Sequence, residues 1–148
     1  MAVTGTLIDR QDSRRKNVRY AHGNLFVTVK RHGFMNVFQK PQIVNWMDFN
    51  RLGMAFISDH KYHVGSELLI ELSIDDLDGI NKESVSGVVG IITNMRKDAG
   101  SYRYGIKFDF DANEYMESDA LKQSLMSIEH LLKDIFSRLH QKRHSPGG

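Results

Sequence analysis

Glu67-Leu68-Leu69-Ile70-Glu71-Leu72-Ser73-Ile74 is the stretch that decides the fold. In its second half, the apolar residues Ile70, Leu72 and Ile74 alternate with polar residues. Side chains in a β-strand point to opposite faces in turn, so this period of two is typical of a strand with one buried face. We therefore expect a half-buried strand over residues 66–74.

Further strands are predicted on both sides of this stretch. Each candidate is rich in β-branched or aromatic residues and is bounded by turn-forming residues. These candidates cover residues 24–30, 37–46, 53–58, 84–95 and 102–110. Pro41 interrupts the second candidate, because proline cannot donate a hydrogen bond to a neighbouring strand. A turn at Lys97-Asp98-Ala99-Gly100 joins the last two candidates.

The last third of the chain changes to a helical period. Apolar residues recur at steps of three and four between residues 121 and 139, which indicates an amphipathic helix with Glu129 and Lys133 on its polar face. Asn113 or Ser118 is expected to cap its start. Six short strands followed by one helix predict an all-β-dominated fold, a six-stranded antiparallel β-barrel with a C-terminal amphipathic α-helix.

The sequence fits one domain without targeting or membrane segments. Its 148 residues suffice for a single core. We expect a flexible basic arm over residues 1–23, the barrel and helix over residues 24–143, and a tail over residues 144–148. The chain has no cysteine, which excludes disulfides and cysteine–metal sites. Neither a signal-peptide pattern nor an apolar run of about 18 residues occurs, so we expect a cytoplasmic protein without membrane insertion.

The N-terminal quarter of the chain is strongly basic. Between Arg10 and Arg31 there are seven basic residues and one acidic residue, Asp12. Such a cluster concentrates anions and favours a phosphate-bearing ligand, although a solvated arm has the same composition. Arg14, Arg15 and Arg19 are the candidate binding residues. The planar guanidinium of arginine can bond a phosphate, or the O6 and N7 atoms of guanine, through two hydrogen bonds at once.

A second group of polar residues follows at Asp48, Asn50 and Gly53. At strand spacing, Asp48 and Asn50 face the same side. A carboxylate can accept hydrogen bonds from the N1 and N2 groups of guanine, an amide can donate and accept, and glycine allows close approach of the backbone. A plain turn is the alternative, because Asp, Asn and Gly are also turn residues. Trp46, two residues before Asp48, is predicted to face the same surface.

Taken in order, the two groups resemble the signature of the PilZ family, which is an Arg-x-x-x-Arg arm followed by (Asp/Asn)-x-Ser-x-x-Gly. In this sequence the arginines are Arg15 and Arg19, and the second motif is residues 48–53. The resemblance covers roughly residues 14–110, since Tyr104-Gly105-Ile106-Lys107-Phe108 is similar to the closing strand of the family. The sequence departs from the pattern at Asn50, which stands where the family has serine.

The resemblance implies a bacterial receptor that binds cyclic di-GMP on the outer face of a six-stranded barrel. It implies that Arg15 and Arg19 clamp bases and phosphates, that Asp48 accepts from a guanine edge, and that Asn50 and Gly53 complete the site. An arginine at the position of Arg14 goes, in the family, with binding of a stacked pair of cyclic di-GMP molecules. The implied output is second-messenger signalling to a protein effector in motility, biofilm or virulence control.

Two other functions stay open. The chain could be a PilZ-like interaction adaptor whose ligand binding is weak or lost, for which Asn50 is the support. A nucleic-acid-binding small barrel would use the basic arm and bind in a salt-dependent way, but we do not expect a nucleic-acid partner. No enzyme is expected, because no nucleophile elbow or phosphate-binding loop occurs. No metal site or cofactor is expected either, because His60-x-x-His63 and the acidic run at residues 75–78 lack the further ligands of a metal site.

Overall fold

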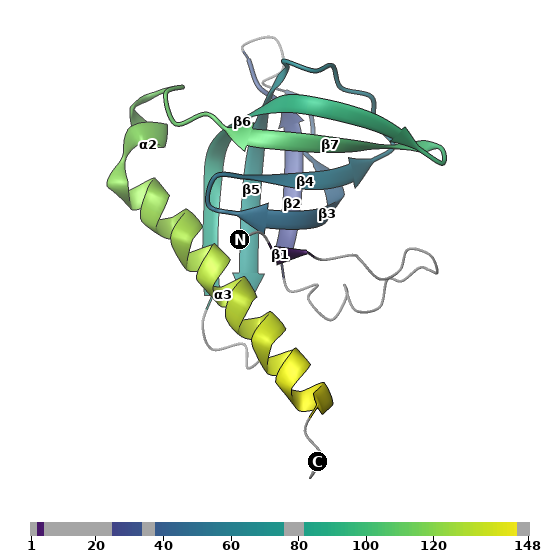
Figure 1. The fold of residues 1–148 in the computed structure, drawn as a ribbon. Coiled ribbons are helices and arrows are strands. Elements are labelled where there is room, and N and C mark those ends of the chain that lie inside the picture. The colour runs from purple at the N-terminus through teal and green to yellow at the C-terminus, as the bar shows by residue number, and fades with distance from the viewer. Residues whose placement is uncertain (1–2, 5–24, 34–37, 76–81, 145–148) are drawn as a thin grey trace.

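The computed structural model describes residues 3–4, 25–33, 38–75 and 82–144 (Figure 1). Within these ranges the chain forms short strands first and helices last. The elements are β1 (Val3–Thr4), β2 (Leu25–Arg31), β3 (Gln42–Asn50), β4 (Gly53–Ser58), β5 (Glu67–Asp75), β6 (Lys82–Asp98), β7 (Ser101–Phe108), α2 (Glu114–Glu117) and α3 (Asp119–His144). The expected arm over residues 1–23 thus contains the short strand β1, while residues 5–23 and 145–148 lie outside the described residues.

Strands β2 to β7 close into an antiparallel barrel. Their order around the sheet is β3-β2-β5-β6-β7-β4, and β4 pairs back with β3. This closure pairs each of the six strands on both sides, which protects strand edges from pairing with other chains. The predicted six-stranded antiparallel barrel with a C-terminal helix is confirmed.

Bulges and one proline explain where the strands differ from the predicted segments. Strand β3 begins directly after Pro41, which cannot donate to the ladder, and it continues to Asn50. Strand β6 is 17 residues long. Its pairing with β5 and with β7 shifts register on each side, and such bulges bend a long strand around a barrel. The turn into β7 uses Ala99 and Gly100, both with positive φ, as a two-residue hairpin requires.

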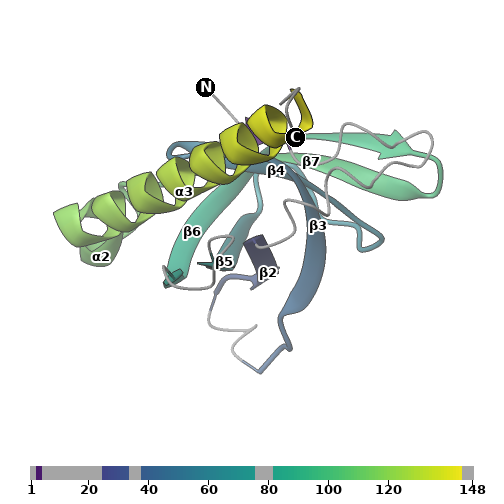
Figure 2. The same ribbon diagram turned by 90° about the horizontal axis from the view of Figure 1, so that it is seen from below.

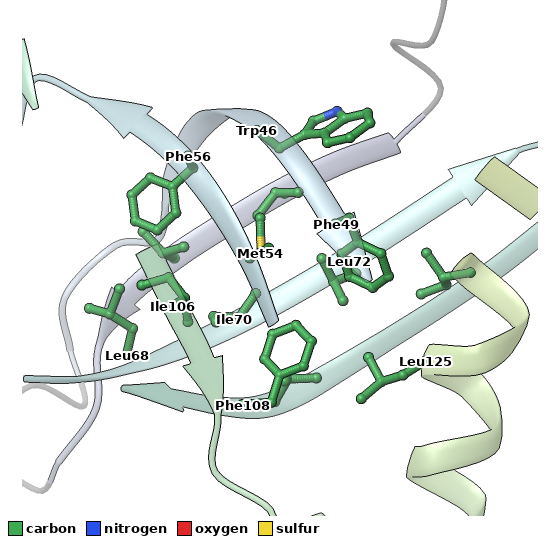
Figure 3. Close-up of a cluster of buried hydrophobic side chains, with 14 of the residues drawn as sticks. Trp46, Phe49, Met54, Phe56, Leu68, Ile70, Leu72, Ile106, Phe108 and Leu125 are labelled. Carbon is green, nitrogen blue, oxygen red and sulfur yellow. The ribbon is translucent and has the colours of Figure 1, made fainter. Parts of the chain in front are cut away.

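One hydrophobic core fills the barrel and extends to the helix. Strand β5 alternates as its sequence predicts and buries Leu68, Ile70, Leu72 and Ile74. Leu125 of α3 belongs to the same buried cluster (Figure 3). The long helix lies outside the barrel and crosses it obliquely, packing against β6, β3 and β1 (Figures 1 and 2).

Both predicted caps are present, because two helices follow the barrel instead of one. The Asn113 side chain accepts a hydrogen bond from the backbone N–H of Met116 at 2.8 Å and caps α2. The Ser118 hydroxyl accepts from the backbone N–H of Leu121 at 3.2 Å, in the first turn of α3. Capping satisfies backbone donors that have no partner within a helix.

An ion pair anchors α3 to the turn between β3 and β4. Arg51 donates to one carboxylate oxygen of Glu129 from Nε at 2.8 Å and from Nη2 at 2.7 Å, and its backbone N–H donates to the other oxygen at 3.2 Å. Glu129 is only 3% exposed, so the prediction that it lies on the polar face was wrong. Its position next to the apolar stripe is tolerated because Arg51 satisfies the carboxylate.

The charge of Glu129 depends on this partner. Burial alone would raise the pKa of Glu129, but the hydrogen bonds from Arg51 and the nearby charge of Lys133 hold the pKa below its ordinary value. The ionised carboxylate therefore stabilises the folded protein above the pKa that the group has in the unfolded chain. This contribution is lost as the pH falls through the lower pKa of the folded state.

We expect Arg51→Ala to lower the free energy of unfolding at pH 7 by about 3 kcal/mol, because a buried carboxylate would lose its hydrogen-bonded cation and keep only Lys133, 4.0 Å away. Urea unfolding measures this change. Arg138→Ala is a matched control, since Arg138 is as exposed as Arg51 (48% each) and bonds Asp134 at 3.2 Å on the helix surface. Such an exposed pair contributes about 0.5 kcal/mol or less. Equal losses in the two variants would contradict the anchoring role of Arg51.

Candidate functional site

The β3–β4 hairpin brings together Asp48, Asn50 and Gly53, three of the six predicted site residues. Asn50 pairs with Gly53 across the two-residue turn, and Asp48 pairs with Ala55 two positions away. Arg14, Arg15 and Arg19 lie outside the described residues. The structure therefore describes the half of the predicted site that the barrel itself provides.

A bulge at Met47 sets the direction of the Asp48 side chain. Trp46 pairs with Phe56 and Asp48 pairs with Ala55, so Met47 is an extra residue on β3. The extra residue breaks the period of two, so Trp46 and Asp48 no longer share a face. Trp46 lies in the buried core, as Figure 3 shows, and the prediction that it faces the Asp48 surface was wrong.

Asn50 shapes the hairpin turn. Its Oδ1 atom accepts hydrogen bonds from the backbone N–H groups of Leu52 at 2.7 Å and Gly53 at 3.1 Å. Asparagine commonly stabilises turns in this way. The turn interpretation of this position therefore holds, and the group that Asn50 can offer a ligand is its amide nitrogen.

Gly53 has a structural reason to be glycine. A Cβ atom at this position would overlap the backbone carbonyl oxygen of Ile106 on β7. Close packing of β4 against β7 thus excludes other residues, whatever the ligand. Two residues of the motif, Asn50 and Gly53, have roles in the fold that need no ligand.

Asp48 has a different environment, because its charge is poorly compensated. Burial raises the pKa of Asp48 above its ordinary value, while the positive charge of Arg103 and a hydrogen bond from the backbone of Ala55 act in the opposite direction. A half-buried carboxylate with a raised pKa is typical of a functional site. Such a group gains most from a ligand that donates hydrogen bonds to it.

Arg103 is a residue near the site that the sequence did not reveal. It lies on β7, where Tyr104 and Ile106 point into the core, so Arg103 points outward. Only the pairing of β7 with β4 brings it near Asp48, which is more than 50 positions away in the chain. The alternation along β7 predicts that Arg103 is on the outer face, but not which strand lies beside it.

Strand β3 also holds both ends of the segment that carries the predicted arginines. Upstream of this segment, Thr4 of β1 pairs with Asp48. Downstream of it, Val27 of β2 pairs with Val44. Residues 5–24 therefore connect two strands that both bond to β3, one of them beside Asp48.

The described residues offer little sign of other chemistry. Among them, no three His, Asp or Glu side chains gather into a group that would hold a metal ion. In the same part of the chain, no helix is both long enough and apolar enough to cross a membrane. Among the described residues of the predicted site, Asp48 is the one whose pKa is raised by burial.

Comparison with solved structures finds a similar fold. The chain is similar to the Bacillus subtilis inhibitor of motility (MotI/DgrA), with a TM-score of 0.51 and 12% sequence identity. The match covers 81% of this chain and 49% of that one, so this chain spans about half the length of its neighbour. No protein-family model matches the chain, and no curated protein matches it by sequence. At this identity the likeness supports the fold alone.

We expect Asp48→Asn to stabilise the protein at pH 7. Because the pKa of Asp48 is raised in the folded state, the folded protein holds its proton more tightly, and ionisation costs stability as the pH rises through that pKa. Asparagine removes this cost and keeps an oxygen for the bond from Ala55. The gain should stay below about 1 kcal/mol, because solvent screens a half-exposed group. Thermal unfolding at pH 7 and at pH 3 tests this, and a gain that persists at pH 3 would contradict it.

Proposed function

We propose that this protein is a bacterial, cytoplasmic receptor of the PilZ type that binds cyclic di-GMP on the outer face of β3. The observation that carries the proposal is the attachment of segment 5–24 at both ends to β3. This topology ties Arg15 and Arg19 to the strand that carries Asp48. Arg19 is six residues before Leu25, where β2 begins, so the chain can place it at most about 20 Å from the start of that strand.

The arginines of the arm and the polar residues of β3 together are complementary to a guanine dinucleotide. Cyclic di-GMP carries two phosphates and two guanines. Arg15 and Arg19 supply positive charge and paired donors for phosphates and for the O6/N7 edge of guanine. Asp48 supplies the acceptor for the N1 and N2 donors, and the amide nitrogen of Asn50 supplies a further donor.

The ligand would act by changing the arm. We propose that the arm folds over cyclic di-GMP and then presents a new surface to a protein effector. Contacts of the arginines with guanine and phosphate offset the entropy lost when the arm becomes ordered. By its resemblance to the family, Arg14, which precedes the motif, implies two stacked dinucleotides per site. The structural neighbour is an inhibitor of motility, which is in keeping with such an output.

A ligand-independent adaptor is the second candidate. The specific observation in its favour is that Asn50 and Gly53 both serve the hairpin itself, through the turn and through packing against β7. The presence of Asn50 and Gly53 is therefore weaker evidence for ligand binding than the motif alone suggests. An adaptor would bind its protein partner equally with and without the dinucleotide.

We expect wild-type protein to bind cyclic di-GMP in calorimetry, and Arg15→Ala and Arg19→Ala each to weaken binding about tenfold or more, as loss of a two-bond arginine contact does. Lys16→Ala is the matched control, because it removes a neighbouring charge from the same arm but not from the motif. It should weaken binding only about threefold or less, and higher salt should remove that effect.

No binding by the wild-type protein at tens of micromolar would contradict the receptor proposal. Capture of the same protein partner with and without dinucleotide would then support the adaptor instead. Equal losses of affinity in Lys16→Ala and in the two arginine variants would show that the arm attracts the ligand only through its overall positive charge.

A further inference from the structure

We infer that Arg103 is an additional guanine-binding residue, and that Asp48 and Arg103 hold two different edges of one guanine across β4. The inference rests on the proposed function and specifies how the base is recognised. It adds to the site a residue from β7, far in sequence from both motifs.

Strand pairing places the two residues on one surface. Asp48 pairs with Ala55 on β4, and Ala55 pairs in turn with Gly105 on β7. Arg103 is two residues from Gly105, so the two positions face the same side. Asp48 and Gly105 are two strand spacings apart, about 10 Å. The carboxylate and the guanidinium thus approach the space above β4 from its two sides.

Small and apolar residues lie between Asp48 and Arg103. Ala55 has a small side chain and is 7% exposed, and Gly105 has no side chain at all. The amide of Asn94, from β6, lies over Gly105, so close that a Cβ there would be 2.7 Å from its nitrogen. Ala55, beside Asp48, and Ile57, which pairs with Arg103, therefore line β4 between the two charged residues, and Asn94 bounds the far side.

Guanine suits this arrangement of groups. Its N1 and N2 groups are donors, and its O6 and N7 atoms are acceptors on the neighbouring edge. A carboxylate on one side and a guanidinium on the other satisfy both edges of the same base. Adenine presents a donor, N6, where guanine has O6, so it would lose a bond to Arg103. The pair therefore predicts selectivity for guanine over adenine.

The charges around Arg103 favour conformers of its side chain that point toward β4. The positive charge of Arg103 acts on the carboxylate of Asp48, so the two groups lie near enough to interact electrostatically across β4. Arg96 lies directly opposite Arg103 on β6. Like charges at facing positions repel, which favours conformers of Arg103 that lean toward β4.

Calorimetry with cyclic di-GMP and cyclic di-AMP tests the inference. We expect Arg103→Ala to weaken cyclic di-GMP binding about 10- to 100-fold and to reduce the preference over cyclic di-AMP. Arg103→Lys should fall between the wild type and Arg103→Ala, because lysine keeps the charge but not the planar pair of donors. Arg96→Ala is the control, one strand further from Asp48, and should change affinity less than about threefold.

The outcomes separate this inference from the proposed function. No binding by the wild type would refute the receptor itself. Binding by the wild type with equal affinities for Arg103→Ala and Arg96→Ala would overturn the role of Arg103 and leave the receptor intact. Measurements at pH 6 and pH 8 exclude an indirect effect, because a loss seen only at pH 6 would mean that Arg103 acts solely through the protonation of Asp48. Thermal midpoints of the variants should stay within a few degrees of the wild type.

Discussion

The pairing of β3 with β4 is the constraint on which the rest of the structure depends. It closes the six-stranded sheet, and its two-residue turn is fixed from three directions. Asn50 bonds the turn from within, Arg51 ties it to Glu129 on α3, and Gly53 lets β4 pack against β7. Loss of any of these contacts would disturb the barrel, the helix and the candidate site together.

The residues of the β3–β4 hairpin have different roles. Asn50, Arg51 and Gly53 hold the fold, whereas Asp48 carries a charge that the fold does not fully compensate. Because of the bulge at Met47, Trp46 points into the core while Asp48 points to the outer face. In the proposed receptor, ligand binding and not folding would maintain a residue such as Asp48 that lowers stability.

The fold could be predicted from the sequence because its elements are marked locally. The alternation in β5, the helical period after Leu121 and the caps at Asn113 and Ser118 need only neighbouring residues. The bulge at Met47 left no such mark, so the direction of Trp46 was predicted wrongly. Glu129 looked like a surface residue because its partner, Arg51, is 78 positions away.

Some features of the candidate site could likewise be predicted from the sequence, and others needed the structure. Its motif residues Asp48, Asn50 and Gly53 were found from spacing and resemblance, and the hairpin brings them together. The turn bonds of Asn50 and the contact that requires glycine at position 53 needed the structure. Arg103 also needed it, since only the pairing of β4 with β7 brings it near Asp48.

The central claim is that cyclic di-GMP lies between the arginine-bearing arm and the outer face of β3. An NMR titration of nitrogen-labelled protein with cyclic di-GMP tests this most directly. We expect backbone amide signals to shift in two separate segments, residues 13–19 and residues 48–55, at the same ligand concentration. Unchanged spectra, or shifts confined to α3, would contradict it.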